Sequence, residues 1–153
     1  MVISVIMRKL AKALGKNERK WELVGLLHDL DYDMVDWDMS KHGIIAAGLL
    51  AKKMPKDSLY AIKSHDNRTG IKPNNMLGNA LVVADTLALI VEIVAASGEL
   101  TIKRIRGEIE ISEKKPWYMD NMLKVKELGF NLNEVLRLGI ESARDAPHER
   151  AQF

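Results

Sequence analysis

Histidine and aspartate residues with the chemistry of metal ligands recur between residues 28 and 85 of the chain. His28 and Asp29 are adjacent and follow an apolar run, and His42, His65 and Asp85 come later, in an apolar segment or near an expected helix end. Imidazole nitrogens and carboxylate oxygens bind divalent transition metals. Polar side chains without partners in apolar settings are costly. The pattern therefore predicts that these five residues bind a metal, although the first pair alone would also suit an ordinary helix C-terminus.

Asp85 lies in a segment, residues 78–91, that is apolar all round an expected helix. Such a helix is expected to be buried, and a buried carboxylate is almost never found without a partner. We expect a metal to be that partner. The alternative is a buried ion pair or a hydrogen bond from a backbone amide.

The motifs around these residues resemble those of the HD-domain superfamily of metal-dependent phosphohydrolases. Residues 25–32 look like the central His-Asp motif of that family, and residues 83–87 look like its closing Asp motif. Residues 41–43 and 61–66 are similar to segments that supply two extra histidines in members that hold two metals, such as hydrolases of dinucleoside tetraphosphates. The resemblance covers about residues 1–90.

The resemblance implies a compact all-α bundle that hydrolyses a phosphate ester or anhydride, with a nucleotide as substrate. Asp29 would be the central catalytic and metal-binding residue, and His28, His42, His65 and Asp85 would complete the ligands of one or two metals. Such a metal lowers the pKa of a bound water. Because the chain has no cysteine, its ligands come from histidine and carboxylates, which favours Mn, Fe, Co, Ni, Zn or Mg as the divalent ion.

The family has another metal-binding histidine upstream of the central motif, and residues 1–20 contain none. Residues 5–11 look like the stretch that follows this histidine in relatives. We expect that the natural reading frame extends upstream and encodes it, or that the 153-residue form binds metal poorly. Two rival functions follow: a metal-binding or nucleotide-sensing module without turnover, and a helical scaffold with a buried polar network and no metal.

Other polar residues between the motifs are candidates for roles beside the metal. The loop at residues 31–38 contains four aspartates but lacks the central Gly and final Glu of an EF-hand. Asp33, ahead of Asp31 or Asp36, is the candidate for orienting water or acting as a general acid. The alternative is that the acidic run is a solvated face.

Two cations and three aromatic residues are candidates for contacting a substrate. Arg68 has planar bidentate donors suited to phosphate and Lys63 offers a point charge, but either could be ordinary surface charge. Trp117, Tyr118 and Phe130 are expected to anchor the later helices to the core. An aromatic wall for a nucleobase is the alternative.

Composition sets limits on the class of protein. A chain of 153 residues with 47% hydrophobic residues is expected to fold as one domain. A net charge of +2 gives no reason to expect nucleic acid as a partner, and the longest apolar stretch contains Asp85 and Glu92 and is short for a membrane span. We expect a cytoplasmic protein with a small phosphate-containing substrate and no membrane partner, and oligomerisation is left open.

Capping and breaking residues predict helices almost throughout. Asn17 is expected to cap the second helix and Ser40 the third, while Pro55 ends the third and Asp57 caps the fourth. Residues 1–98 should form the metal-site helices and residues 99–153 a helical extension of the same domain. The expected helices cover about residues 2–14, 18–30, 40–54, 57–65, 75–97, 101–109, 116–128 and 132–145.

Overall fold

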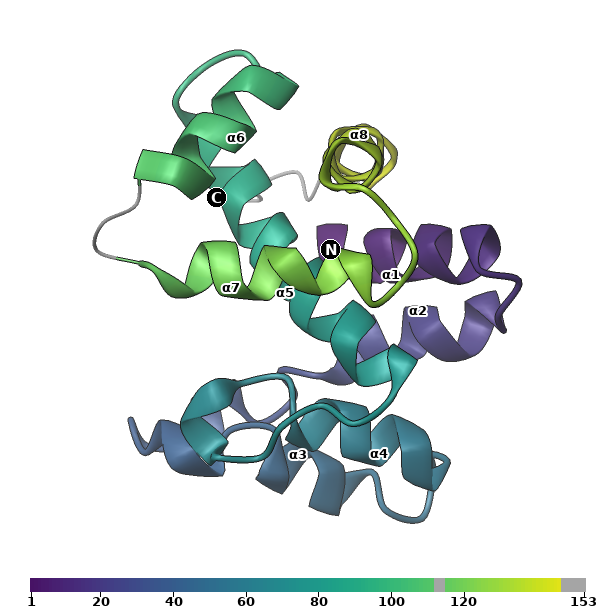
Figure 1. Cartoon of the computed structure of the whole chain (residues 1–153). Coiled ribbons are helices and arrows are strands. Elements are labelled where there is room, and N and C mark those ends of the chain that lie inside the picture. The colour runs from purple at the N-terminus through teal and green to yellow at the C-terminus, as the bar shows by residue number, and fades with distance from the viewer. Residues whose placement is uncertain (112–114, 147–153) are drawn as a thin grey trace, which may run out of the picture.

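Helices form all the regular structure in the part of the chain that the computed structural model describes, residues 1–111 and 115–146 (Figure 1). The all-α class expected from the sequence is therefore confirmed. The α-helices are α1 (Val2–Ala13), α2 (Glu18–Leu27), α3 (Ile44–Leu49), α4 (Lys56–Lys63), α5 (Met76–Ala96), α6 (Ile102–Ile111), α7 (Trp117–Leu123) and α8 (Leu132–Asp145). Short 3-10 turns are η1 (Tyr32–Met34), η2 (Met39–Lys41), η3 (Asn67–Thr69) and η4 (Lys124–Lys126).

Asparagine side chains start three of these helices. Asn17 accepts a hydrogen bond from the Lys20 amide at the start of α2, and Asn75 accepts one from the Gly78 amide at the start of α5. Asn131 and Glu134 form a reciprocal capping box at the start of α8. These caps satisfy amide groups that the first turn of a helix leaves without partners. The expected beginnings of α2, α5 and α8 are thus confirmed.

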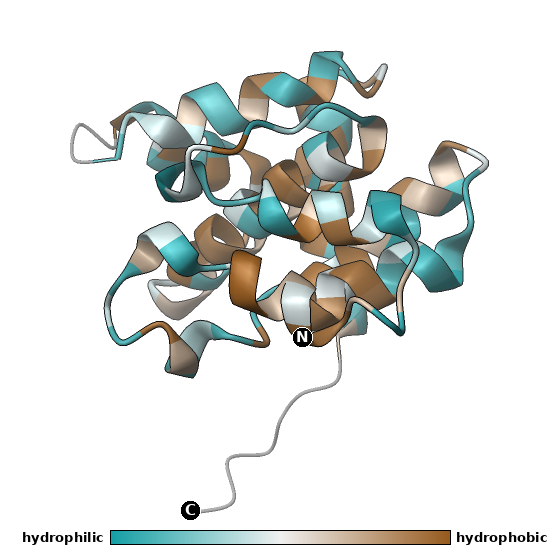
Figure 2. Cartoon of the chain, turned by 90° about the horizontal axis from the view of Figure 1, so that it is seen from below, coloured by the Kyte–Doolittle hydropathy of each residue, from teal (hydrophilic) through white to brown (hydrophobic). Residues whose placement is uncertain are grey.

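The long helix α5 lies at the centre of the fold, and α1, α2, α4, α6, α7 and α8 all pack against it. A single hydrophobic core draws residues from the first helix to the last, so α6, α7 and α8 complete the same core as the earlier helices. Figure 2 shows apolar colours gathered where the helices meet and hydrophilic colours on the outer turns. By length and composition α5 could also cross a membrane, and 61% of its most apolar window is buried inside the protein.

The prediction of a third helix over residues 40–54 is wrong. The chain instead forms η2, turns at Gly43 and then begins the short helix α3. Gly43 has a left-handed φ of +76°, and a Cβ atom there would collide with the carbonyl oxygen of Ile62 and lie 3.2 Å from the His65 ring. Glycine therefore permits a close approach between this turn and the end of α4. That approach places His42 next to His65.

The second expected helix also ends earlier than predicted, at Leu27 instead of residue 30. His28 is its C-terminal cap, and the chain then turns into η1. The adjacent pair His28 and Asp29 therefore leaves the helix together, with Asp29 at the start of the turn.

Candidate metal centre

Each of the five predicted ligands is presented by a different part of the fold, except for the adjacent pair. His28 and Asp29 end α2, His42 follows η2, His65 comes two residues after α4, and Asp85 lies in the middle of α5. The structure brings all five together. The three histidine side chains are buried, whereas the side chains of Asp29 and Asp85 are 42% and 40% exposed.

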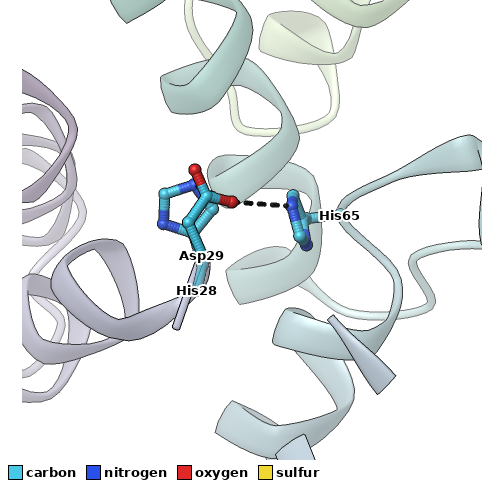
Figure 3. Close-up of side chains that lie close together, drawn as sticks. All are labelled: His28, Asp29 and His65. Atoms are coloured by element: carbon cyan, nitrogen blue, oxygen red, sulfur yellow. Dashed lines mark ion pairs between the residues drawn. The ribbon is translucent and has the colours of Figure 1, made fainter. Parts of the chain in front are cut away.

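One oxygen atom, Oδ1 of Asp29, lies at the centre of the cluster. It is 3.1 Å from Nε2 of His28, 3.0 Å from Nε2 of His42 and 3.6 Å from Nε2 of His65. Oδ1 of Asp85 lies 3.6 Å from the same nitrogen of His28. Figure 3 shows His28 and Asp29 together at the end of α2 and His65 across from them, with a dashed line between Asp29 and His65. Three imidazole nitrogens from distant points of the sequence therefore converge on one carboxylate.

Backbone carbonyl groups fix two of these rings. Nδ1 of His28 donates a hydrogen bond to the carbonyl oxygen of Gly25 at 2.9 Å, and Nδ1 of His65 donates to that of Ile62 at 2.7 Å. A carbonyl oxygen can only accept, so the proton of each neutral ring is on Nδ1. Nε2 then carries a lone pair that is directed at the cluster, which is the arrangement found in metal-ligating histidines. Nε2 of His28 is buried and has no hydrogen-bond partner among the described residues.

A carboxylate fixes the third ring. Nδ1 of His42 donates to Oδ1 of Asp31 at 2.9 Å, and the other oxygen of Asp31 accepts a hydrogen bond from the backbone amide of Ala46 at 2.8 Å. Asp31 is fully buried. The sequence suggested Asp31 only as a secondary candidate for orienting water, and its role as the support of His42 was missed. No local signal distinguishes Asp31 from the other aspartates of the same loop.

The cluster attracts positive charge. Burial lowers the pKa of His28, but the carboxylates of Asp29 and Asp85 outweigh it and raise that pKa to about 10. Burial also lowers the pKa of His42, and again Asp29, together with Asp31, raises it above the ordinary value. Burial raises the pKa of Asp29, and the neighbouring rings of His28, His42 and His65 outweigh this effect and hold that pKa far below the usual range. Without another cation, the carboxylates therefore favour the protonated forms of His28 and His42.

A divalent metal fits these residues. Ligand atoms of His28, Asp29 and His65 all lie within 4.8 Å of one another. Ligands about 2.1 Å from a common ion are separated by roughly 3 to 4 Å, and the measured spacings between Asp29 and the two rings fall in that range. The unpartnered Nε2 of His28 supplies a further reason, because a buried lone pair without a donor is costly.

Asp85 is not buried in the apolar core as the sequence suggested. The helix around it is apolar on all sides, and most of its residues are buried, but the Asp85 side chain opens onto a cavity of about 430 Å³. The cavity borders the cluster at His65 and Asp85. Its wall comes from η3 and its flanks, α5 and α7, namely His65, Asp66, Asn67, Arg68, Asp85, Leu89, Trp117 and Asn121.

Arg68 lines this cavity and is paired with a neighbour. Its guanidinium donates hydrogen bonds to both carboxylate oxygens of Asp66, and 55% of its side chain is exposed. Hydrogen bonding to Asp66 raises the pKa of Arg68 above its ordinary value. A carboxylate on one side orients the guanidinium, which has further N–H groups that can donate to a ligand.

The structure does not bring two predicted residues to the cluster. Lys63 ends α4 and is not part of the cavity wall. Asp33 lies exposed on η1 and lines a separate hollow with Trp37 and Met39. Over residues 1–111 and 115–146, neither side chain makes a hydrogen bond or ion pair with the five clustered residues.

The aromatic residues divide between the two expected roles. Tyr118 is fully buried, and Phe130 packs partly buried against the core, so both anchor the C-terminal helices as expected. Trp117 also packs against the core, and at the same time it forms part of the cavity wall. Its neighbour Asn121, which the sequence did not suggest as a site residue, lines the same cavity.

Comparisons of the chain with protein-family models, with curated proteins and with solved structures found no match. The similarity to HD-domain proteins consequently stays a prediction from four short motifs. What the site can do is therefore inferred from its own geometry: a buried set of oriented imidazoles, two accessible carboxylates and an adjoining cavity that contains an arginine.

Proposed function

We propose that the protein is a metal-dependent phosphohydrolase of the HD-domain type, which cleaves a phosphate ester or anhydride, with a nucleotide as its substrate. The observation that carries this proposal is the convergence of three Nε2 atoms on Oδ1 of Asp29, with each ring fixed through its Nδ1 atom. Oriented imidazoles with outward lone pairs are what a catalytic metal requires. The adjoining cavity with Arg68 supplies room for a phosphate.

The metal would be held by His28, His42, His65, Asp29 and Asp85, as one ion or two. A divalent ion there supplies Lewis acidity and makes water a stronger nucleophile at neutral pH. The chain's own residues do the rest. The exposed oxygens of Asp29 and Asp85 can accept a proton from water, and Arg68 offers N–H donors to the phosphoryl oxygens of a substrate in the cavity.

Water is the favoured nucleophile because the residues that the structure describes offer no activated side chain. It has no cysteine. Among the described residues, no serine hydroxyl hydrogen-bonds to a histidine ring, and the serine hydroxyls with partners bond to backbone carbonyls, to Asp38 or to Arg104. A covalent mechanism would need a hydroxyl or thiol beside a base.

The proposal is tested by a substrate panel on metal-reconstituted protein. Phosphomonoesters, phosphodiesters, nucleotides and dinucleoside polyphosphates would each be supplied with Mn²⁺, Co²⁺, Ni²⁺ or Mg²⁺. We expect that the wild-type protein releases phosphate, that a chelator abolishes this release and that the metal restores it. The Asp29→Asn variant should release none. Asp36→Asn is the matched control, because Asp36 is exposed and has a left-handed φ of +45° that asparagine tolerates.

Two results would contradict this function. A protein with full metal content that hydrolyses nothing in the panel would be a binding or sensing module. A protein that binds no metal under any condition would be a helical scaffold with a buried polar network.

A further inference from the structure

The cavity beside the cluster is lined by two chemically different sets of residues. His65, Asp85 and Arg68 suit an anion and a metal. Trp117 and Asn121, which α7 contributes, offer an aromatic ring and an amide group. A phosphate needs only the first set, so the second set is available to a different part of the ligand.

Trp117 offers an aromatic surface whose position is fixed. Its ring packs edge-to-face on Tyr118, with centroids 4.5 Å apart and planes at 79°. Tyr118 is fully buried, so it anchors the tryptophan to the core. Leu89, which is 38% exposed, adds apolar surface to the same cavity. A fixed indole beside an aliphatic side chain is suited to a planar ring, because stacking on an immobile ring costs little conformational entropy.

Asn121 offers hydrogen-bonding groups that are also held in place. Its Nδ2 atom donates to the hydroxyl of Thr86 at 3.0 Å, and Thr86 is buried in α5. The amide group retains a second N–H donor and its carbonyl acceptor. A donor and an acceptor side by side match the edge of a nucleobase, which is how asparagine reads adenine.

The size of the cavity agrees with a ligand larger than phosphate. Its volume of about 430 Å³ lies in the range of pockets that enclose small organic molecules. Because one cavity is lined by both Arg68 and Trp117, a single ligand can contact both sets of residues.

We propose that α7 forms a nucleobase subsite, in which Trp117 stacks on the base and Asn121 hydrogen-bonds to its edge, while the phosphate of the same mononucleotide lies by Arg68 and the metal cluster. The position of the phosphate rests on the proposed function. The base subsite does not, because it uses residues outside the metal cluster.

Binding to metal-free protein tests the subsite without relying on turnover. Calorimetry would compare AMP, adenosine and ribose 5-phosphate, of which the last has the sugar phosphate without a base. We expect AMP to bind on the order of tenfold or more tightly than ribose 5-phosphate, in line with the contribution of one stacked base. Adenosine alone is expected to bind measurably.

Substitutions on α7 then locate the contacts. Trp117→Ala should weaken AMP binding on the order of tenfold and leave ribose 5-phosphate unchanged, whereas Trp117→Phe, which keeps a ring, should retain most of the affinity. Asn121→Leu should weaken AMP but not ribose 5-phosphate. Trp37→Ala is the control, because Trp37 is 93% exposed and lies outside this cavity. Circular dichroism would verify that each variant is folded.

The outcomes separate this inference from the proposed function. Equal affinity of wild type for AMP and ribose 5-phosphate, or equal loss of both in Trp117→Ala, overturns the base subsite even if the protein hydrolyses phosphate esters. Selective binding of AMP that depends on Trp117 supports the subsite even if no nucleotide is hydrolysed. If the Trp117→Phe variant is folded and loses AMP binding as completely as Trp117→Ala does, stacking is not the cause of the affinity for AMP.

Discussion

Asp31→Asn should weaken metal binding although Asp31 is outside the set of ligands. The Asp31 carboxylate accepts from two donors at once, Nδ1 of His42 at 2.9 Å and the amide of Ala46 at 2.8 Å. An asparagine side chain has only one acceptor oxygen, so one of these donors would face an NH₂ group whichever way the amide is turned. At a fully buried position, an unsatisfied donor costs about 1 to 3 kcal/mol.

That cost reaches the metal through His42. If the ring turns to escape the NH₂ group, its Nε2 atom moves away from Asp29, and loss of a supporting partner of this kind lowers metal affinity about 10- to 100-fold. If the Ala46 amide is left unsatisfied instead, the fold loses a similar free energy at the start of α3. Equilibrium dialysis with Co²⁺ or Mn²⁺ and urea unfolding of the metal-free protein would measure the two effects.

Asp36→Asn is the control for this substitution, because it makes the same chemical change at an exposed position. It should leave both metal affinity and unfolding free energy within about 0.5 kcal/mol of wild type. An Asp31→Asn variant that also matches wild type in both measurements would refute the view that Asp31 holds His42 in place.

Three further results are expected. Asp85→Asn should lose metal and activity but keep its helical circular dichroism, because its side chain is 40% exposed to a cavity and an amide fits there; metal binding equal to wild type would make Asp85 structural. The metal-free protein should lose stability by up to roughly 1.4 kcal/mol per pH unit between pH 6.5 and about 10, because the pKa of His28 is raised from 6.5 to about 10 on folding. The stabilisation is fully present below the unfolded pKa of 6.5 and is lost as the pH rises to the folded pKa. Thermal unfolding at pH 6, 8 and 10 in chelator would show no such trend if this charge were unimportant. Gly25→Ala should destabilise the fold by about 1 to 3 kcal/mol, since the added Cβ would lie 2.9 Å from Cγ of Met7. Gly107→Ala, whose added Cβ would have no atom within 4 Å, should instead stabilise the fold by about 0.4 to 1 kcal/mol. Urea unfolding that ranked the two variants the other way would contradict this packing.

Most of the fold follows from local signals in the sequence. Asn17, Asn75 and Asn131 mark helix starts because their side chains accept from free amides of the first turn, and this depends on few other residues. The prediction of a helix over residues 40–54 was wrong because the spacing of the apolar residues there does not indicate that the chain turns at Gly43. That turn is imposed by the approach to Ile62, a contact between segments distant in sequence.

The clustered residues could be proposed as metal ligands from residue type and spacing, but the groups that hold them in place could not be predicted. Nothing local indicates that Asp31 is buried and bonded to His42, since it belongs to a run of acidic residues whose other members are exposed. Asp33 looked equivalent in the sequence and lies on another surface. Burial distinguishes them, and burial is a property of the assembled fold.

The positions of the residues that line the cavity were predicted less well for the same reason. Asp85 was expected inside the core because the helix around it is apolar, but a helix can be mostly buried and still have one position facing an opening. Asn121 gave no signal at all in the sequence. It becomes a candidate only because α7 packs on α5 and brings it to Thr86.

The most direct test of the central claim is the metal content of the folded protein. Metal-free protein would be dialysed against Mn²⁺ or Co²⁺ and analysed for bound metal, with His28→Gln and Asp36→Asn beside wild type. The oriented imidazoles around Asp29 predict about one or two equivalents per chain in wild type and Asp36→Asn, and a large loss in His28→Gln. Less than about one-tenth of an equivalent in folded wild type, or full metal content in His28→Gln, would contradict a metal centre at this cluster.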